Sequence, residues 1–529
     1  MVELLAVIVI LAIILVIAVP KVISIIEDAK MGTLESTARL IINGAEKKKL
    51  QNQLLGNSKD LECDDVVKLN EQDYGECSID FNENDKASIY IEGKGKFDKM
   101  YCSGASENLI CNIKLEPINC NFNGELVQNA TFIHEQYKYV YEIDTSGGWR
   151  VELNDKQSAE PVTSEICSYI NNEPIVSTAG MYSGSNTTSI DISNFDTSNV
   201  TNMMAMFSNS KVIELDLSKL NSSSVNNMST MFSGSSVDSI KMSGINVGNV
   251  TNVGGMFYNS KIGMVDLSGV NFKKLNSVNG MFSGAQIDNL SLNNVDLRNV
   301  TDYAGMLTST KITNLYMSGL NLSSITSINP SLLSGAQINL IDMSNINLSG
   351  VTSISNMFYG AIIKKINLSG ANLTGLTDMS YIFGKKDSSS PVPNIEEIDM
   401  SYADVSNVTN MSNMFLNNTY VKKLNLEGIK TNSVTDMTYM FSGTSNLDEL
   451  NLSDLNTRNV TDMRYMFNNC GVSTLDLSSF NMTGLVTIEL NEMFNGCLAT
   501  TGYARTQSDA DKLNSSSYKP ETLVFTVKQ

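Results

Sequence analysis

Asn199-Val-Thr-Asn-Met-Met-Ala-Met-Phe207 is a stretch that returns, with small changes, down most of the remaining sequence. The copies that end at Phe232 and Phe257 follow at a spacing of 25 residues. Further copies end at Phe282, Leu307, Leu333, Phe358, Phe383, Phe415, Phe441, Phe467 and Phe494. A fixed period of this size is typical of a solenoid, in which each unit buries its apolar face only against neighbouring units.

A second recurring element, Val212-Ile-Glu-Leu-Asp-Leu-Ser218, lies between these copies. Apolar and polar residues alternate in it, as in a half-buried strand. We therefore expect Ile213, Leu215 and Leu217 to face the core of the solenoid and the acidic residues to face outward. The Val-Thr-x-Met-x-x-Met-Phe segment, with apolar positions three and four apart, predicts one or two helical turns. The sequence therefore predicts a β-rich solenoid of stacked parallel strands and short helical turns, with Met residues in its core.

These elements resemble the BspA-type leucine-rich repeats of bacterial surface proteins, the DUF285 group. The resemblance rests on Thr197-Ser-Asn-Val-Thr201 and Leu475-Asp-Leu-Ser478, and it runs from about Met181 to Phe494. It implies a leucine-rich-repeat-like solenoid on a cell surface, and some relatives of this kind act as adhesins.

Length and composition exclude several classes of function. At 529 residues the chain is too long for one compact core, so several units are expected. The net charge of −19 argues against a nucleic-acid partner, because phosphate binding needs clustered Lys and Arg. The sequence has a single His, His134, and no phosphate-binding, nucleophile-elbow or zinc-protease motif. We therefore expect no enzyme, no cofactor and no catalytic or metal site.

The chain begins with an apolar segment, and Leu4 to Val19 contains no polar residue. As a helix this stretch covers about 24 Å, slightly less than a bilayer core. It lacks the basic start and the small-residue cleavage site of a removable secretory signal. We expect a transmembrane helix over residues 2–20 that continues as an amphipathic helix to about residue 55.

Residues from Val2 to about Lys30 resemble the mature N-terminus of type IV pilins and pseudopilins, through Glu3-Leu-Leu-Ala-Val-Ile8 and Pro20. The resemblance implies prepilin processing with N-terminal methylation, and a leader encoded upstream of a start codon that was placed late. It also implies that Glu3 pairs with the free N-terminus of a neighbouring subunit during assembly. A carboxylate in hydrocarbon is costly and marks a functional position. The alternative is a Glu at the headgroup boundary of a plain anchor.

Six Cys residues lie between the apolar segment and the repeats. Residues 56–116 predict a small pilin-like α+β head, and residues 117–175 predict a small β unit. Local bracketing favours the disulfides Cys63–Cys77, Cys102–Cys111 and Cys120–Cys167 among fifteen pairings. Disulfides suit an oxidising compartment, whereas a zinc site is disfavoured because no Cys-x-x-Cys pair occurs. Cys470 and Cys497 are expected in neighbouring repeats, bonded or not.

The domain order is then a helical region (1–55), the head, the β unit, the repeat array (176–500) and a C-terminal cap (501–529). The interval from Phe383 to Phe415 is longer than the others, and residues 385–393 are expected to form a surface loop. The Asn of the recurrent Asn-Val-Thr is expected in a buried ladder of side-chain amides, not as a glycosylation acceptor, at Asn199, Asn249, Asn299, Asn407 and Asn459.

The outward row of the strands differs from repeat to repeat and is the candidate binding face. Its members are Asp216, Lys241, Asp266, Ser291, Tyr316 and Asp342. Other residue types interrupt the acids, so a solvated face is favoured over a Ca²⁺ or acid–base site. A broad sheet face suits a macromolecule, so the expected partner is an extracellular protein or glycan.

Two functions of different classes follow. The first is a bacterial single-pass membrane protein, anchored by its N-terminal helix with its C-terminal region outside the cytoplasm, that uses the array for adhesion or macromolecular binding. The alternative is a minor pilin or pseudopilin of a type IV pilus or type II secretion system. In that case its partners are other pilin subunits, and the repeats form a tip domain.

Replacing Glu3 by Leu distinguishes docking from anchoring. A more apolar helix should stay in the membrane, but the lost carboxylate should stop incorporation into any filament. Membrane fractionation and filament purification measure the two effects separately. Normal incorporation of the Leu variant would contradict the docking role.

Overall fold

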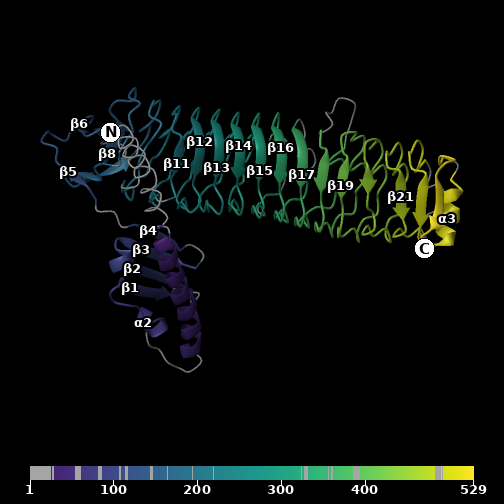
Figure 1. The fold of residues 1–529 in the computed structure, drawn as a ribbon, viewed down its shortest axis with the longest axis horizontal. Coiled ribbons are helices and arrows are strands. Elements are labelled where there is room, and N and C mark those ends of the chain that lie inside the picture. Colours follow the sequence, from purple (N-terminus) through teal and green to yellow (C-terminus); the bar gives the residue numbers. More distant parts are fainter. Residues whose placement is uncertain are drawn as a thin grey trace, which may run out of the picture. The chain divides into compact units, whose positions relative to one another are not determined.

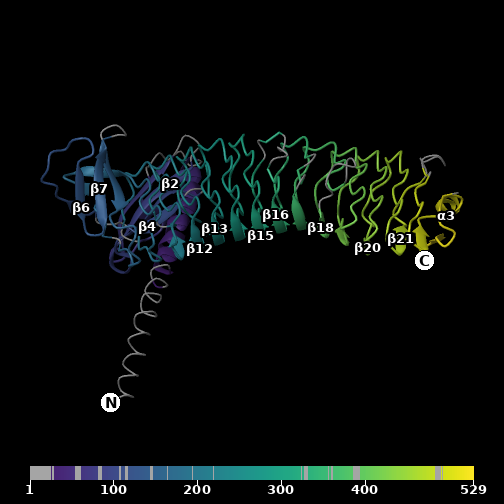
Figure 2. The same cartoon turned by 90° about the horizontal axis from the view of Figure 1, so that it is seen from above.

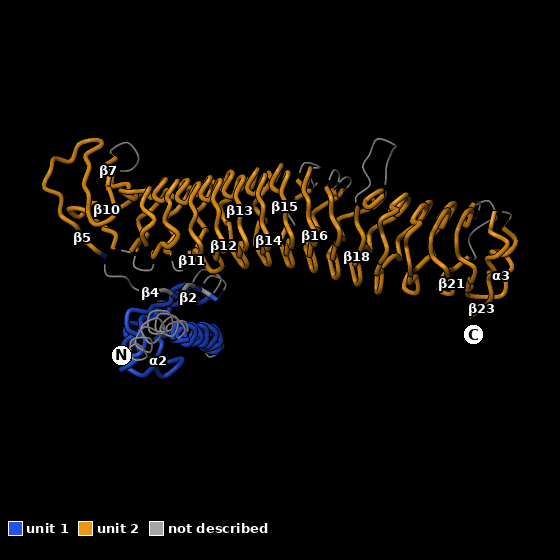
Figure 3. The backbone as a smooth tube through the Cα atoms, turned by 45° about the horizontal axis from the view of Figure 1, so that its top comes forward, with its two compact units in different colours: residues 1–117 blue, residues 118–529 orange. Residues whose placement is uncertain are grey.

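A computed structural model of the chain forms two compact units, residues 1–117 and 118–529 (Figure 3). It describes residues 26, 29–53, 61–81, 86–106, 109–113, 117–142, 147–163, 165–192, 195–218, 220–322, 325–326, 332–354, 357–358, 361–384, 394–482, 490, 492–516 and 518–528. The apolar segment with Glu3 and the 385–393 segment lie outside these residues. Among the described helices, none is long and apolar enough to span a bilayer.

The first unit packs a helix on an antiparallel sheet. Residues 29–53 are helical, and Leu34, Ala38, Ile41, Ile42 and Ala45 are its buried apolar residues. Their spacing of three and four places them on one helix face, which shares a hydrophobic core with the sheet. The sheet order is β1 (Tyr74–Phe81), β2 (Ala87–Gly93), β3 (Met100–Ala105) and β4 (Ile110–Ile113), with short helices α2 (Cys63–Val66) and η1 (Gly95–Phe97). The amphipathic helix is confirmed over these residues, and it forms one core with the head.

Three disulfides lie at the pairs that local bracketing favoured. Cys63–Cys77 and Cys102–Cys111 belong to the first unit, with Cα atoms 6.1 and 4.0 Å apart. Cys120–Cys167 belongs to the second unit, with Cα atoms 5.8 Å apart. Cys470 and Cys497 are buried and not bonded, and burial raises the pKa of the Cys497 thiol to about 12.

The second unit begins with a six-stranded sheet in the order β5-β9-β10-β8-β7-β6. Its strands are β5 (Asn119–Cys120), β6 (Thr131–His134), β7 (Tyr137–Glu142), β8 (Gly148–Leu153), β9 (Tyr169–Ile170) and β10 (Glu173–Ser177). Tyr137, Tyr139 and Trp149 are fully buried here, in a core that continues without a break into the repeats. The predicted small β unit therefore covers the first turn of the solenoid and shares its core.

Ten parallel strands then stack in chain order (Figures 1 and 2). They are β11 (Glu214–Asp216), β12 (Ser236–Lys241), β13 (Lys261–Asp266), β14 (Gln286–Ser291), β15 (Lys311–Tyr316), β16 (Gln337–Asp342), β17 (Ile362–Asn367), β18 (Glu397–Asp399), β19 (Lys423–Asn425) and β20 (Glu449–Leu450). The same repeat position pairs throughout, as in Val237 with Ile262 and Ile262 with Ile287. The parallel-strand solenoid predicted from the period is confirmed.

Two outward residues separate the inward residues of each strand, so simple alternation does not hold. Val237 and Ile240 are buried, and the two N–H groups between them, on Asp238 and Ser239, both donate to the carbonyl of Ile213 (2.8 and 3.2 Å). This is the hydrogen-bond pattern of a bulge, which adds one residue to the alternation. Ile213 itself is 50% exposed, so the prediction that it belongs to the core was wrong.

The segments that return the chain between strands are successions of turns and not helices. Ala205 and Asn209 each have a φ of 55°, and a left-handed residue at every fourth position interrupts a right-handed helix. The N–H group of Phe207, between them, donates to the carbonyl of Met231 in the next repeat (2.8 Å). The prediction of short helical turns was therefore wrong for the described return segments.

The recurrent Phe residues form a column of stacked rings inside the solenoid. From Phe207 to Phe282 neighbouring ring centroids are 4.9 to 5.4 Å apart, and from Phe358 to Phe494 they are 5.5 to 6.0 Å apart. The column is interrupted where Leu307 and its successor replace Phe. An apolar-lined cavity of about 30 Å³ lies in the same part of the core.

The last residues close the open end of the stack. Strands β21 (Thr474–Leu477), β22 (Thr501–Ala504) and β23 (Val524–Val527) form a parallel sheet, with helix α3 (Gln507–Asn514) beside it. The ring of Phe525 lies 5.1 Å from that of Phe494, so the cap ends the Phe column. Thr506 caps the start of this helix, because its hydroxyl accepts the Asp509 N–H; the sequence prediction had not included the helix.

We expect Phe257→Ala to destabilise its part of the array by about 3–5 kcal/mol, because it removes a ring that is completely buried between two others. Tyr258→Ala is the matched control, since the Tyr258 side chain is 47% exposed and its loss should have little effect. Hydrogen–deuterium exchange of the neighbouring turns measures both. Equal protection in the two variants would contradict the stacking argument.

Candidate binding face

The six predicted residues form one row across the outer face of the sheet. Asp216 pairs with Lys241, Lys241 with Asp266, and the register continues through Ser291 and Tyr316. Further members of the row are Asp342, Asn367, Asp399 and Asn425. The structure therefore brings these residues together, while their role in binding stays a prediction.

Most Asp and Asn side chains of this row close a turn directly after their strand. The Oδ1 atom of Asp266 accepts the N–H group of Ser268 at 2.9 Å. The same bond to the residue two positions on occurs at Asp216, Asp342, Asn367, Asp399 and Asn425. This is an Asx turn, which uses a side-chain oxygen to satisfy a backbone donor. Lys241 and Tyr316 lack such an oxygen, so only part of the row is available to a partner.

Many repeats contain two more turns of this kind. In the first complete repeat the closing side chains are Asn202, Asp216 and Asn221, which accept the N–H groups two residues on at 2.9 to 3.2 Å. The three turns lie at the three bends of one solenoid coil. They account for much of the Asn and Asp in the repeats, and the sequence analysis did not predict them. The available signal was an Asx residue that recurs at three fixed positions in most repeats.

Hydrogen bonding lowers the pKa values of two carboxyl groups in the row. Burial alone would raise the pKa of Asp216, but the hydroxyl and N–H groups of Ser218 and the Lys241 ammonium lower it. The pKa of the Asp266 carboxyl is also lowered, because hydrogen bonds, chiefly from Ser268, outweigh the effect of burial. A lowered folded-state pKa gives stability that is present above the unfolded value of about 3.9 and is lost as the pH falls through the folded pKa.

The Asn residues of Asn-Val-Thr form a ladder, but on the surface. The Asn249 amide donates to the carbonyl of Ser223 in the preceding repeat (2.6 Å), and Asn299, Asn407 and Asn459 donate in the same way. These four side chains are exposed, and that of Asn199 is half-buried and donates to the Tyr169 hydroxyl. The prediction of a buried ladder was wrong, because each amide reaches back along the outside of the coil.

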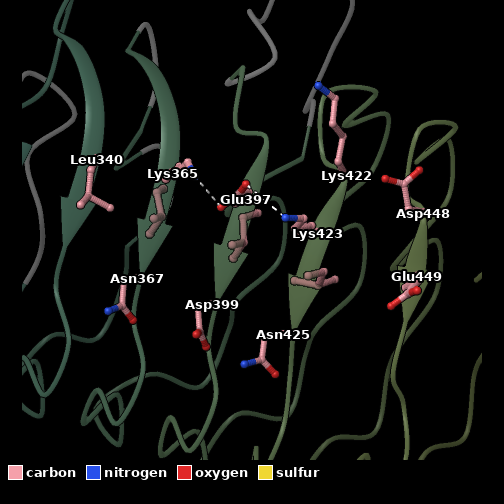
Figure 4. Close-up of a pocket in the computed structure, with 13 residues that line it drawn as sticks. Leu340, Lys365, Asn367, Glu397, Asp399, Lys422, Lys423, Asn425, Asp448 and Glu449 are labelled. Carbon is pink, nitrogen blue, oxygen red and sulfur yellow. Dashed lines mark ion pairs between the residues drawn. The ribbon is translucent and has the colours of Figure 1, made fainter. Parts of the chain in front are cut away.

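A second set of outward residues, just before the row, changes charge from strand to strand (Figure 4). The set consists of Lys364 and Lys365 at β17, Glu396 and Glu397 at β18, Lys422 and Lys423 at β19, and Asp448 and Glu449 at β20. We call it the charge ladder. Glu397 lies between two lysines, with its carboxylate 2.9 Å from Lys365 Nζ and 3.7 Å from Lys423 Nζ. Lys422 Nζ is 3.2 Å from the carboxylate of Glu396.

Six of the eight residues of the charge ladder, all except Lys364 and Glu396, line a groove of about 620 Å³ on the outer face. A second groove of about 610 Å³ crosses β12 to β17, where Asp238, Lys261, Asp288 and Lys311 again alternate in sign. The sequence analysis missed this alternation, although like-charged pairs at one repeat position were visible. Aligning the repeats on the following Ile or Leu would have found it.

The only His lies beside a disulfide. The ligand atoms of Cys120, His134 and Cys167 lie within 4.8 Å of one another, but the two sulfur atoms are bonded to each other. Metal binding by Cys needs thiolates, so in this oxidised state the cluster offers one imidazole and no thiolate.

Residues 176–294, 277–395 and 389–505 each match the family described as "Mycoplasma protein of unknown function, DUF285". Together these matches cover more than half of the chain. The chain belongs to the DUF285 family. This confirms the DUF285 resemblance of the repeats, whereas the pilin-like segment lies mostly outside the described residues.

This DUF285 chain was also compared with curated proteins and with solved structures. No curated protein matches it. Among solved structures, the crystal structure of the pneumococcal vaccine antigen PcpA matches with 13% identity, covering 76% of this chain and 99% of that chain, at a TM-score of 0.27. A TM-score this low carries no argument about function.

We expect Asp266→Ala to lower the melting temperature, with a loss of about 1–3 kcal/mol, because the Ser268 N–H group loses its acceptor. Asp266→Asn is the matched control, since an amide oxygen can still close the turn. The wild type should lose stability below about pH 4, and the Asn variant should lose less over that range. Thermal melts at several pH values measure both effects, and identical pH profiles would contradict the assignment.

Proposed function

We propose that this DUF285 chain is a bacterial surface protein that binds a macromolecule, by adhesion or by capture, through the outer face of its strand sheet. The observation that carries the proposal is the division of labour in each coil. The inward positions are occupied by Phe, Met and aliphatic residues that pack in the core, and Asx turns stabilise the bends. The remaining side chains, on the outer face of the strands, are the ones free to differ.

The size and charge of this face favour an extended partner. Ten strands at about 4.8 Å spacing give a surface more than 40 Å long, with grooves of about 620 and 610 Å³. Lys and acidic residues alternate along it, whereas a nucleic-acid surface needs an excess of cations. An extracellular protein or glycan is therefore the proposed partner, and binding without catalysis is the proposed activity.

Surface location is supported by the cysteine chemistry. Three disulfides occur in the described residues, and such bonds persist in oxidising compartments outside the cytoplasm. We propose further that the apolar segment 2–20 anchors the chain in a membrane with the array outside. This anchoring rests on the sequence of that segment alone.

A minor pilin or pseudopilin is the second candidate. The amphipathic helix over residues 29–53 favours it, because it follows the pilin-like segment in the sequence and packs into the head. In that case the head and helix join other subunits, and the array is carried at the tip. The binding face of the array would serve both candidates.

Substituting Lys261, Lys311 and Tyr316 together by Ala should weaken binding without lowering the melting temperature, because these side chains lie on the outer face of the strands and not in the core. Arg464→Ala is the matched control on the return side, where the Arg464 guanidinium pairs with the nearby Asp462. Both are compared with the wild type in pull-downs on a panel of extracellular proteins and glycans. If residues 1–117 bind and residues 118–529 do not, the working surface is the head and the proposal is wrong.

A further inference from the structure

We infer that the charge ladder on β17 to β20 is a docking surface for a second copy of this chain, with the two solenoids antiparallel. The inference rests on the proposed function in one respect, since it takes the outer face of the strands as the working surface. It goes further by naming the partner. The argument comes from the sign and order of the charges.

The order of charges is self-complementary under one two-fold axis. The four strands carry, in turn, two Lys, two Glu, two Lys, and an Asp with a Glu. An axis parallel to the strands, between β18 and β19, sets β17 against β20 of the second copy and β18 against β19. Lys364 then meets Asp448, and Glu396 meets Lys422. Every contact between the two ladders joins opposite charges, as a two-fold interface requires of one surface.

The parallel arrangement is excluded by the same charges. An axis along the solenoid would set each strand against itself, so Lys364 and Lys365 would face the same lysines of the second copy. Like charges directly opposed across an interface cost several kcal/mol. The ladder therefore favours one relative orientation and opposes the other.

Contacts within one copy leave part of the ladder unused. The lysines that pair with Glu396 and Glu397 are exposed and the two Glu residues are only half-buried, and such surface pairs contribute little to stability. Within the described part of the chain, Lys364, Asp448 and Glu449 form no ion pair. These residues lie at the two ends of the ladder, which the antiparallel arrangement brings together.

Shape and apolar surface fit the same arrangement. The groove of about 620 Å³ along the ladder gives depth for the long Lys and Glu side chains of a second copy. Ile362 and Tyr420, on the same edge of the ladder, are 49% and 44% exposed. Covering them adds apolar burial to the charge pairs.

The area makes the contact weak for a single pair of molecules. Four strands span about 19 Å across the sheet, and six consecutive extended residues of a coil span about 20 Å, so each copy buries on the order of 400 Å². Stable interfaces bury more than about 1,000 Å² in total. Many copies on two facing surfaces would multiply such a contact by avidity. Antiparallel pairing is the orientation in which copies on opposed surfaces meet, so the contact suits adhesion between like cells.

Two charge variants test the pairing. E396K/E397K reverses β18 alone, so lysines face lysines across the two-fold axis, and self-association should fall on the order of tenfold or more. The matched variant E396K/E397K/K422E/K423E exchanges β18 and β19. It restores every opposite pair between copies, but it leaves lysines next to lysines on β17 and β18 within one copy. Association should therefore return although the ladder within each copy is broken. E396Q/E397Q removes the charge without repulsion and should give an intermediate loss.

The full chain is compared by sedimentation velocity at rising concentration and by aggregation of beads coated with it, with melting temperatures measured in parallel. Added salt should weaken the association, because the Debye length shrinks from about 10 Å at 0.1 M to about 3 Å at 1 M. Association that is as strong in E396K/E397K as in the wild type, as apolar clustering through residues 1–25 would give, overturns the inference, and so does a failure of the exchange of β18 and β19 to restore association. So does a monomer at every concentration.

The same beads separate this inference from the proposed function. If coated beads do not aggregate with one another but bind the panel of extracellular proteins and glycans, the pairing is wrong and the proposed function stands. If they aggregate with one another and ignore the panel, the second copy is the partner itself. Failure of both overturns both.

Discussion

Each coil of the solenoid is held by contacts between its residues and the residues at the same repeat positions in the next coil. The rings of Phe207 and Phe232 lie 5.4 Å apart and almost parallel, and the N–H of Phe207 donates to the carbonyl of Met231. A spacing near 4.8 Å between strands imposes this match on every position. Apolar side chains, Asx turns and amide ladders are all stabilised when the same residue type lies at the same position of the adjacent coil. Within residues 118–529, the six-stranded sheet covers one end of the stack and the C-terminal cap covers the other.

Charged residues are the one class that cannot meet their equivalents without cost. Lysines repeated at one position would stand about 4.8 Å apart along the whole face. The alternation between Lys365, Glu397 and Lys423 turns this repulsion into attraction. It also penalises a slip by one coil, which would otherwise be cheap in a stack of near-identical units. The alternation of charges that fixes the register within one molecule is therefore also a pattern that a second molecule can bind.

The repeat period was enough to predict the parallel solenoid, the register of the row from Asp216 to Asp342 and the cap. Local bracketing was enough for the three disulfides. Ile213 and the helical turns were mistaken because periodicity records which residues are apolar, not how the backbone bends between them. The bulge at Asp238 and Ser239 and the left-handed Ala205 arise from hydrogen bonds between coils, which no single repeat reveals. The charge ladder was visible in the sequence, but only after the longer interval before Phe415 is allowed for.

The gap in the Phe column divides the array mechanically. Stacked rings run from Phe207 to Phe282 and again from Phe358 to Phe494, and between them the core has Leu307 and a small cavity. In a stack held by nearest-neighbour contacts, load passes through every coil in series, and extension begins at the weakest junction. A molecule pulled from both ends should therefore lengthen first near Leu307. The charge ladder lies wholly on the coils from Phe358 to Phe494, so a contact made there would persist after the coils near Leu307 have separated.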